Sequence, residues 1–289
     1  MTKTVSLVLG SGGARGLAHI GVIKWLEEND YKIQSISGCS MGALIGGIYA
    51  AGKLDEYEHW ARAISDIDIF RLMDLSWNKS GILKGDKIIN TLTELVGDQD
   101  IETLPIKYTA VAADIVNEKE VWINKGSLFN AIRASISLPL LITPHEHNGV
   151  KLIDGGVLNP VPIAPTFGDG TQLTIAVNLG GPIEKVPIAT EAPPQPFNNL
   201  STFQERINYF IKRLTTDNDK KKSNEDWGLY DVANQAFDAM QSTIARQKLA
   251  AYPPDYTIEI PRNACGTLEF DRADEMIDLG YRKAQHMFS

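Results

Sequence analysis

The chain of 289 residues contains only two cysteines, Cys39 and Cys265. Two cysteines cannot build the disulfide framework of a small secreted protein, and no Cys-x-x-Cys pair of the kind that binds metal is present. Long apolar runs are also missing, because no stretch reaches the roughly 18 residues that a membrane-spanning helix needs. We therefore expect no disulfide, no bound metal and only peripheral contact with a membrane.

Basic residues are outnumbered, with 28 lysines and arginines against 36 aspartates and glutamates and a formal net charge of -8. A nucleic-acid partner is not expected, because binding one normally requires a basic face. Residues 1–4 lead directly into an apolar segment, without the basic start and cleavage site of a secretory signal. We expect a cytoplasmic protein that contacts at most the inner face of the membrane. The composition leaves the oligomeric state open, a homo-oligomer included.

The first 180 residues alternate between short apolar segments and segments with helical periodicity. The expected strands are 5–9, 32–37, 106–113, 120–123, 150–153 and 173–178. The expected helices are 17–26, 43–51, 55–72, 84–96 and 127–135, the last with Ser127 as its N-cap. This alternation predicts an α/β fold with a mainly parallel central sheet and helices on both faces.

The composition changes after residue 180. Residues 181–228 are rich in proline and charge, and we expect a mobile insert there. Within it, 201–215 has the pattern of an amphipathic helix, which suits a lid, a membrane contact or simple core packing. Residues 229–289 are expected to complete the same domain with a helix, a strand at 256–260 and a final helix at 271–287. The expected core-facing residues of the first of these helices are Val232, Ala236, Phe237, Met240 and Ile244.

A serine turn follows the second predicted strand. Its sequence, Gly38-Cys39-Ser40-Met41-Gly42, has the Gly-x-Ser-x-Gly form and precedes a helix of small residues. A sharp turn of this kind exposes the serine hydroxyl, and its glycines let neighbouring backbone pass closely. The positive end of the helix would favour an oxyanion at Ser40. The pattern alone is weak, because many ordinary tight turns match it.

A second glycine-rich segment lies between the first predicted strand and helix, with the sequence Gly10-Ser11-Gly12-Gly13-Ala14-Arg15-Gly16. It matches neither the dinucleotide fingerprint, which needs glycine in place of Arg15, nor the Walker phosphate loop. Free backbone amides on such a loop can form an oxyanion hole, and Gly12 and Gly13 are the expected donors. We group Arg15 with them, either as a direct contact to substrate or as the partner of a carboxylate that fixes the loop.

The third segment is Asp154-Gly155-Gly156, which follows the strand predicted at 150–153. A serine nucleophile needs a base. Asp154 could take the proton of Ser40 directly if burial raises its pKa above the usual value of about 3.9. Alone, Asp-Gly-Gly is more often a turn.

Together, and in this order, the three segments resemble the motifs of the patatin-like phospholipases. The glycine-rich loop ending in Arg15-Gly16 resembles their oxyanion loop, and the segments at 38–42 and 154–156 resemble their serine turn and Asp-Gly-Gly/Ala motif. Residues 134–139, Ala-Ser-Ile-Ser-Leu-Pro, and 159–162, Asn-Pro-Val-Pro, resemble two further family blocks. The resemblance covers about 5–178, is greatest to the small cytoplasmic bacterial branch, and implies a three-layer sandwich with a catalytic core at 1–180.

The resemblance also implies a reaction: calcium-independent hydrolysis of phospholipid or lysophospholipid esters by a Ser40–Asp154 dyad, without a cofactor. Asp154 would accept the Ser40 proton, the amides of Gly12 and Gly13 would stabilise the oxyanion, and Asp154 would then protonate the leaving alcohol and activate water. Two alternatives stay open. One is acyl transfer to another lipid by the same acyl-serine, and the other is a non-enzymatic lipid-binding regulatory protein of the same fold.

Histidine is not needed by such a dyad, and we expect none of the five histidines to take part in the chemical step. The segment His145-Glu146-His147 invites interpretation as a metal site. Two alternating histidines without a third ligand cluster instead favour a polar loop.

Overall fold

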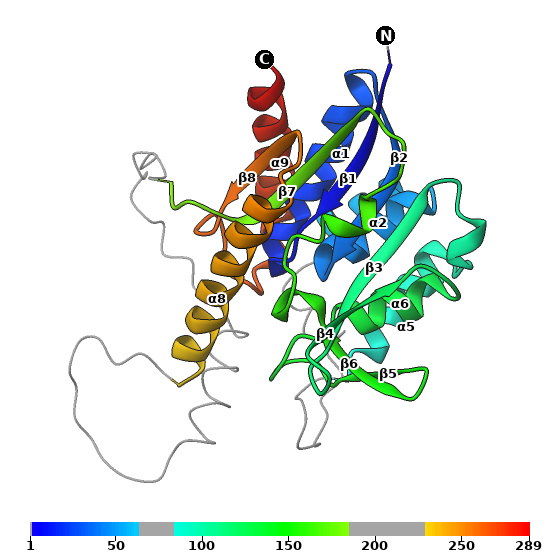
Figure 1. The fold of residues 1–289 in the computed structure, drawn as a ribbon, viewed down its shortest axis with the longest axis vertical. Coiled ribbons are helices and arrows are strands. Elements are labelled where there is room, and N and C mark those ends of the chain that lie inside the picture. Colours follow the sequence, from blue (N-terminus) through cyan, green and yellow to red (C-terminus); the bar gives the residue numbers. More distant parts are fainter. Residues whose placement is uncertain (1, 64–83, 185–228) are drawn as a thin grey trace, which may run out of the picture.

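The computed structural model describes residues 2–63, 84–184 and 229–289 (Figure 1). The amphipathic helix expected at 201–215, most of the expected insert and the second half of the helix expected at 55–72 lie outside these residues. The strands are β1 (Lys3–Leu9), β2 (Tyr31–Cys39), β3 (Lys107–Asp114), β4 (Lys119–Ile123), β5 (His145–His147), β6 (Val150–Asp154), β7 (Leu173–Gly181) and β8 (Tyr256–Pro261). The α-helices are α1 (Ala18–Glu28), α2 (Met41–Ala50), α3 (Leu54–Ala63), α5 (Asp86–Val96), α6 (Leu128–Ser135), α8 (Leu229–Ala251) and α9 (Ala273–Phe288).

These strands form one mixed sheet in the order β5-β6-β3-β2-β1-β7-β8, with β4 also paired to β3. Neighbours from β3 through β2, β1 and β7 to β8 are parallel, whereas β4, β5 and β6 run antiparallel to their partners. The predicted α/β fold with a mainly parallel sheet is therefore confirmed. In the described part of the chain, no helix combines the length and apolar character needed to cross a bilayer.

Side chains of β1 alternate between two hydrophobic clusters, one on each face of the sheet. Leu7 and Leu9 belong to the larger cluster, with residues of α1, α2, α6 and α9, while Val8 belongs to a small cluster that includes Ala245 of α8. This alternation is the two-residue period of a strand buried on both faces. Helices therefore cover both faces, and the face under α8 is the more thinly covered.

Two expectations from the sequence are wrong. Residues 145–147 form the strand β5, which pairs with β6, and not a polar loop. Polar residues at the sheet edge carry no apolar alternation by which a strand could be recognised. In α8, Met240 is 56% exposed and Val232 46% exposed, so the side of the helix that carries them does not face the core.

The buried side of α8 instead carries Gln241, Ser242 and Ala245. α8, gold in Figure 1, packs against β7. Its small and polar side chains replace the large apolar ones that the periodicity predicted, because this helix lies against the glycine-rich loop after β1. Gln241, for example, donates to the hydroxyl of Ser11 at 3.2 Å.

Candidate active site

The serine turn joins β2 to α2. Ser40 has φ 54° and ψ -122°, a strained conformation for a residue other than glycine, and its exposed fraction is 8%. A Cβ atom on Gly42 would lie 2.0 Å from the carbonyl oxygen of Leu9, and one on Gly38 would lie 2.4 Å from that of Gly42. Both glycines are thus required by backbone that passes closer than any side chain permits.

Asp154 is the last residue of β6. Strand β3, with which both β2 and β6 pair, places it near the serine turn. Cys39, which precedes the serine, pairs with Val111 of β3, and Asp154 pairs with the adjacent Ala112. The pairing of β2 ends at Val111 and that of β6 begins at the next residue of β3, so the two registers bring Ser40 and Asp154 to the same end of one strand. Their separation of 114 positions in the chain is bridged by sheet register.

The carboxyl of Asp154 is fully buried. Burial raises its pKa to about 6, and hydrogen bonding by the Ser40 hydroxyl, the Gly156 amide and the Cys39 thiol opposes the rise. Oδ1 accepts the Gly156 amide at 2.8 Å, while Oδ2 forms no well-aligned hydrogen bond with any described residue. Asp154 is therefore ionised at neutral pH, more basic than an exposed aspartate, and has one oxygen free to accept a proton.

The glycine-rich loop holds most of its amides in hydrogen bonds. The amides of Gly10, Ser11 and Ala14 donate to carbonyl groups of neighbouring segments at 3.0, 2.8 and 2.9 Å. Those of Gly12 and Gly13 donate to no residue within the described ranges. Of these two glycines, Gly13 lines the same cavity as Ser40.

Arg15 is buried and fixes the loop. Its Nε donates to the carbonyl of Gly12 at 3.1 Å, its Nη1 to that of Arg262 at 2.7 Å, and its Nη2 pairs with Asp238 of α8 at 3.0 Å. Of the two roles left open for this arginine, the contacts fit the pairing with a carboxylate. Its grouping with the oxyanion donors stays a prediction, which these contacts do not support, because the side chain is turned to Gly12, Arg262 and Asp238 and does not line the Ser40 cavity.

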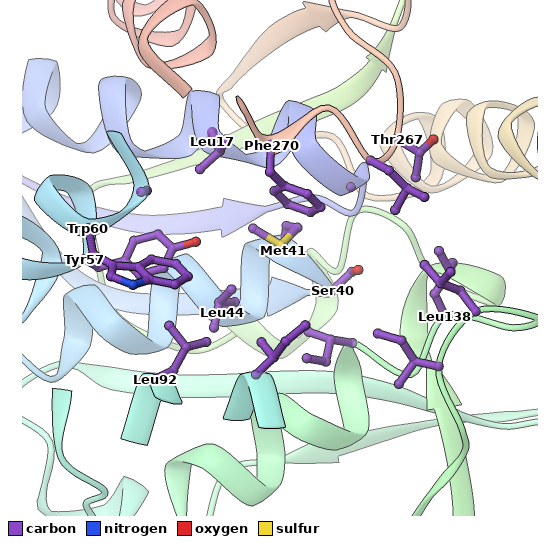
Figure 2. Close-up of a pocket in the computed structure, with 17 residues that line it drawn as sticks. Leu17, Ser40, Met41, Leu44, Tyr57, Trp60, Leu92, Leu138, Thr267 and Phe270 are labelled. Carbon is purple, nitrogen blue, oxygen red and sulfur yellow. The ribbon is translucent and has the colours of Figure 1, made fainter. Parts of the chain in front are cut away.

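Ser40 opens into an apolar cavity of about 140 Å³. Tyr57 and Trp60 of α3 lie at the end away from Ser40, whereas Leu138 and Thr267 lie on the side of Ser40 (Figure 2). The sequence did not identify this lining, because it comes from segments that are far apart in the chain. Leu17, Met41, Leu44, Leu92 and Phe270 complete much of the wall.

No histidine is hydrogen-bonded to Ser40 or Asp154 in the part of the chain that the structure describes. His19 is fully buried, its Nε2 lies 2.9 Å from the carbonyl oxygen of Gly10, and burial lowers its pKa to about 4. The two histidines of β5 are half-buried at the sheet edge. No group of three His, Cys, Asp or Glu residues within the described ranges is placed to bind a metal.

Comparison with known proteins identifies the family. The family model for "Patatin-like phospholipase" matches residues 7–167, a range that includes all three glycine-containing segments. The chain belongs to the patatin-like phospholipase family. The resemblance inferred from the sequence is thereby confirmed, and this patatin-like phospholipase is a lipid ester hydrolase.

Its relatives include proteins of the NTE family. An uncharacterized NTE family protein of Mycobacterium tuberculosis is 39% identical, over 96% of this chain and 89% of its own. Lysophospholipase NTE1 of Candida albicans is 28% identical over 99% of this chain, which spans 20% of that protein. Human patatin-like phospholipase domain-containing protein 6 is 27% identical, again over 99% of this chain and 20% of its own length.

Some contacts in this patatin-like phospholipase could not be found from sequence. Gln241 reaches Ser11 from 230 positions away, and Asp238 reaches Arg15 from 223. Neither residue lies in a recognisable motif. Ser135 accepts a hydrogen bond from the Ser40 amide and donates one to the carbonyl of Val111 in β3. It lies in the 134–139 block, which is the one sequence signal for its segment.

Proposed function

We propose that the chain hydrolyses ester-linked acyl chains of phospholipids or lysophospholipids with Ser40 as nucleophile and Asp154 as base. One observation carries this proposal: a buried carboxylate with an unpaired oxygen shares the end of β3 with a strained serine that opens into an apolar cavity. The strained turn aims the hydroxyl, and the buried carboxylate is basic enough to activate it.

The chemistry follows from these groups. Asp154 Oδ2 accepts the proton as Ser40 Oγ attacks the ester carbonyl carbon, and the free amides of Gly12 and Gly13 stabilise the oxyanion. Asp154 then gives that proton to the departing alcohol, which leaves an acyl-serine. In the second half, Asp154 takes a proton from water, which attacks the acyl carbonyl, and the proton returns to Ser40 as the fatty acid leaves.

The acyl chain occupies the cavity that leads from Ser40 toward Trp60. Its wall is apolar, so transfer of each methylene from water contributes about 0.8 kcal/mol to binding. The polar head of the lipid then lies outside the cavity, on the solvent side of Ser40.

A lipid surface is the proposed source of the substrate, and Leu140 is the proposed contact. This leucine has φ 68° and is 67% exposed, while its neighbours Leu138 and Leu141 line the cavity. Leu140→Asp is expected to weaken binding to phospholipid vesicles, whereas Val116→Asp, at an equally apolar exposed position away from the cavity, is not. Equal binding by the two variants would remove Leu140 from the proposed contact.

Product analysis with defined lipids tests the function. The protein is incubated with a lysophospholipid, a diacyl phospholipid and a monoacylglycerol, each with and without a second acceptor alcohol. Free fatty acid should appear in the wild type and be absent with Ser40→Ala. An acyl-alcohol product in place of fatty acid would indicate acyl transfer, and no product from any lipid would support the non-enzymatic alternative.

A further inference from the structure

The end of helix α6 contacts both members of the proposed dyad. The backbone N–H of Ser40 donates to Oγ of Ser135 at 2.9 Å. The backbone N–H of Asp154 donates to the carbonyl oxygen of Ser137 at 2.9 Å. A segment of three residues therefore holds the main chain of the nucleophile and of the base at the same time.

The hydroxyl of Ser135 also binds to β3. It donates to the carbonyl oxygen of Val111 at 2.7 Å. Gly155, the residue after the base, packs against that same carbonyl, because a Cβ atom at Gly155 would lie 2.2 Å from it. The Ser135 hydroxyl thus links the amide of Ser40 to the carbonyl of Val111, against which the residue after Asp154 packs.

Ser40 needs such support because of its backbone. Its φ of 54° is unfavourable for a side chain with a Cβ atom, so surrounding contacts must hold the conformation. Ser135 is fully buried, and no solvent is at hand to replace its hydroxyl as acceptor. Without that hydroxyl the Ser40 amide would be buried and unpaired, and the turn could relax away from Asp154.

We propose that Ser135 is a positioning residue, whose hydroxyl sets the distance between Ser40 Oγ and Asp154. The proposal rests on the proposed function, since it assumes that these two residues carry the reaction. Ser135 contacts no reacting atom. Its loss affects the rate at which bound ester reacts and leaves the apolar cavity that binds the acyl chain intact.

The test compares Ser135→Ala with Ser6→Ala. Ser6 of β1 is also fully buried and its hydroxyl also makes two hydrogen bonds, to Asp169 at 3.0 Å and Thr171 at 2.8 Å, but it lies away from the site. With a soluble nitrophenyl ester, Ser135→Ala is expected to lower kcat about 100-fold, the usual effect of a small misplacement of reacting groups. Its KM should stay within about twofold, and Ser6→Ala should keep both constants within about twofold.

Ser135→Thr adds a rescue measurement, because threonine retains the hydroxyl. We expect it to recover most of the kcat lost in Ser135→Ala. The proposal is overturned if Ser135→Ala keeps kcat within about threefold of wild type, or loses no more than Ser6→Ala at a matched melting temperature. Ser40→Ala separates the two levels: activity that survives Ser40→Ala removes the proposed function, whereas activity lost there but retained in Ser135→Ala removes only this inference.

Discussion

The thiol of Cys39 donates a hydrogen bond to Oδ1 of Asp154, with sulfur and oxygen 3.8 Å apart. The residue before the nucleophile therefore contacts the carboxylate proposed as its base. Such a bond stabilises the ionised form of Asp154 and opposes the rise in pKa caused by burial.

Replacement of Cys39 should therefore change the pH dependence of hydrolysis. In wild type, kcat/KM for a soluble ester is expected to fall as the pH drops through about 6, where Asp154 becomes protonated. Cys39→Ala removes a donor to the carboxylate, so this limb should move to higher pH. Cys39→Ser retains a donor and should leave it in place. An unchanged limb in Cys39→Ala would mean that the thiol does not influence the titrating group.

Asp154→Asn should lower activity and raise stability. Asparagine cannot accept the Ser40 proton, so we expect a loss in kcat of order 10³ or more, as for comparable triad lesions. A loss below about tenfold, or 1.4 kcal/mol, would exclude Asp154 as the essential base.

The gain in stability follows from the raised pKa of Asp154. Because that pKa is about 6 in the folded protein and 3.8 in the unfolded chain, the ionised carboxylate destabilises the fold. This cost is absent below about pH 4 and complete above about pH 6, where it amounts to about 3 kcal/mol at 1.36 kcal/mol per pKa unit. Urea denaturation should therefore show Asp154→Asn more stable than wild type at pH 7.5, with the difference shrinking toward pH 4.5. A constant difference would contradict the raised pKa.

Single replacements of the five histidines should leave hydrolysis of a soluble ester within about tenfold of wild type. The variants are His19→Ala, His59→Ala, His145→Ala, His147→Ala and His286→Ala. His19 is the severest case, because its Nε2 contacts the carbonyl oxygen of Gly10 in the glycine-rich loop at 2.9 Å. His19→Gln, which offers an amide donor there, should be measured beside it. A folded histidine variant as inactive as Ser40→Ala would contradict the dyad.

The length of the preferred acyl chain should depend on Trp60, which stands at the far end of the cavity with its ring 5.7 Å from that of Tyr57. Trp60→Ala lengthens the cavity, so chains two carbons longer than the wild-type optimum should gain about tenfold in relative kcat/KM. Trp122→Ala, on the partly exposed β4, is the matched control and should show no such shift. The same chain-length profile in both variants would place the acyl chain elsewhere.

Sequence patterns located the glycine-rich turns because turn geometry is a local property. Gly38 and Gly42 are needed by backbone within a few ångströms, and the strand and helix around them are strongly periodic. The meeting of Ser40 with Asp154 depends on the register of β2 and β6 against β3, which local patterns do not encode. Only the family resemblance predicts that Ser40 and Asp154 lie together.

Other features had no local signal at all. Periodicity predicts the wrong buried face for α8, because the contacts of this helix with the glycine-rich loop are made by Asp238 and Gln241, polar residues that periodicity places in solvent. Residues 134–139 match a family block, but that match assigns no role to Ser135, since its proposed role rests on two hydrogen bonds to segments 95 and 24 positions away. Tertiary contact over such distances decides both cases.

Covalent labelling tests the central claim most directly. The protein is treated with a fluorophosphonate, digested, and its peptides are analysed by mass spectrometry, with Ser40→Ala treated in parallel. The account predicts a single adduct on the peptide that contains Ser40 and none in the variant. An adduct on another residue, or a wild-type protein that is not labelled, would contradict Ser40 as the nucleophile.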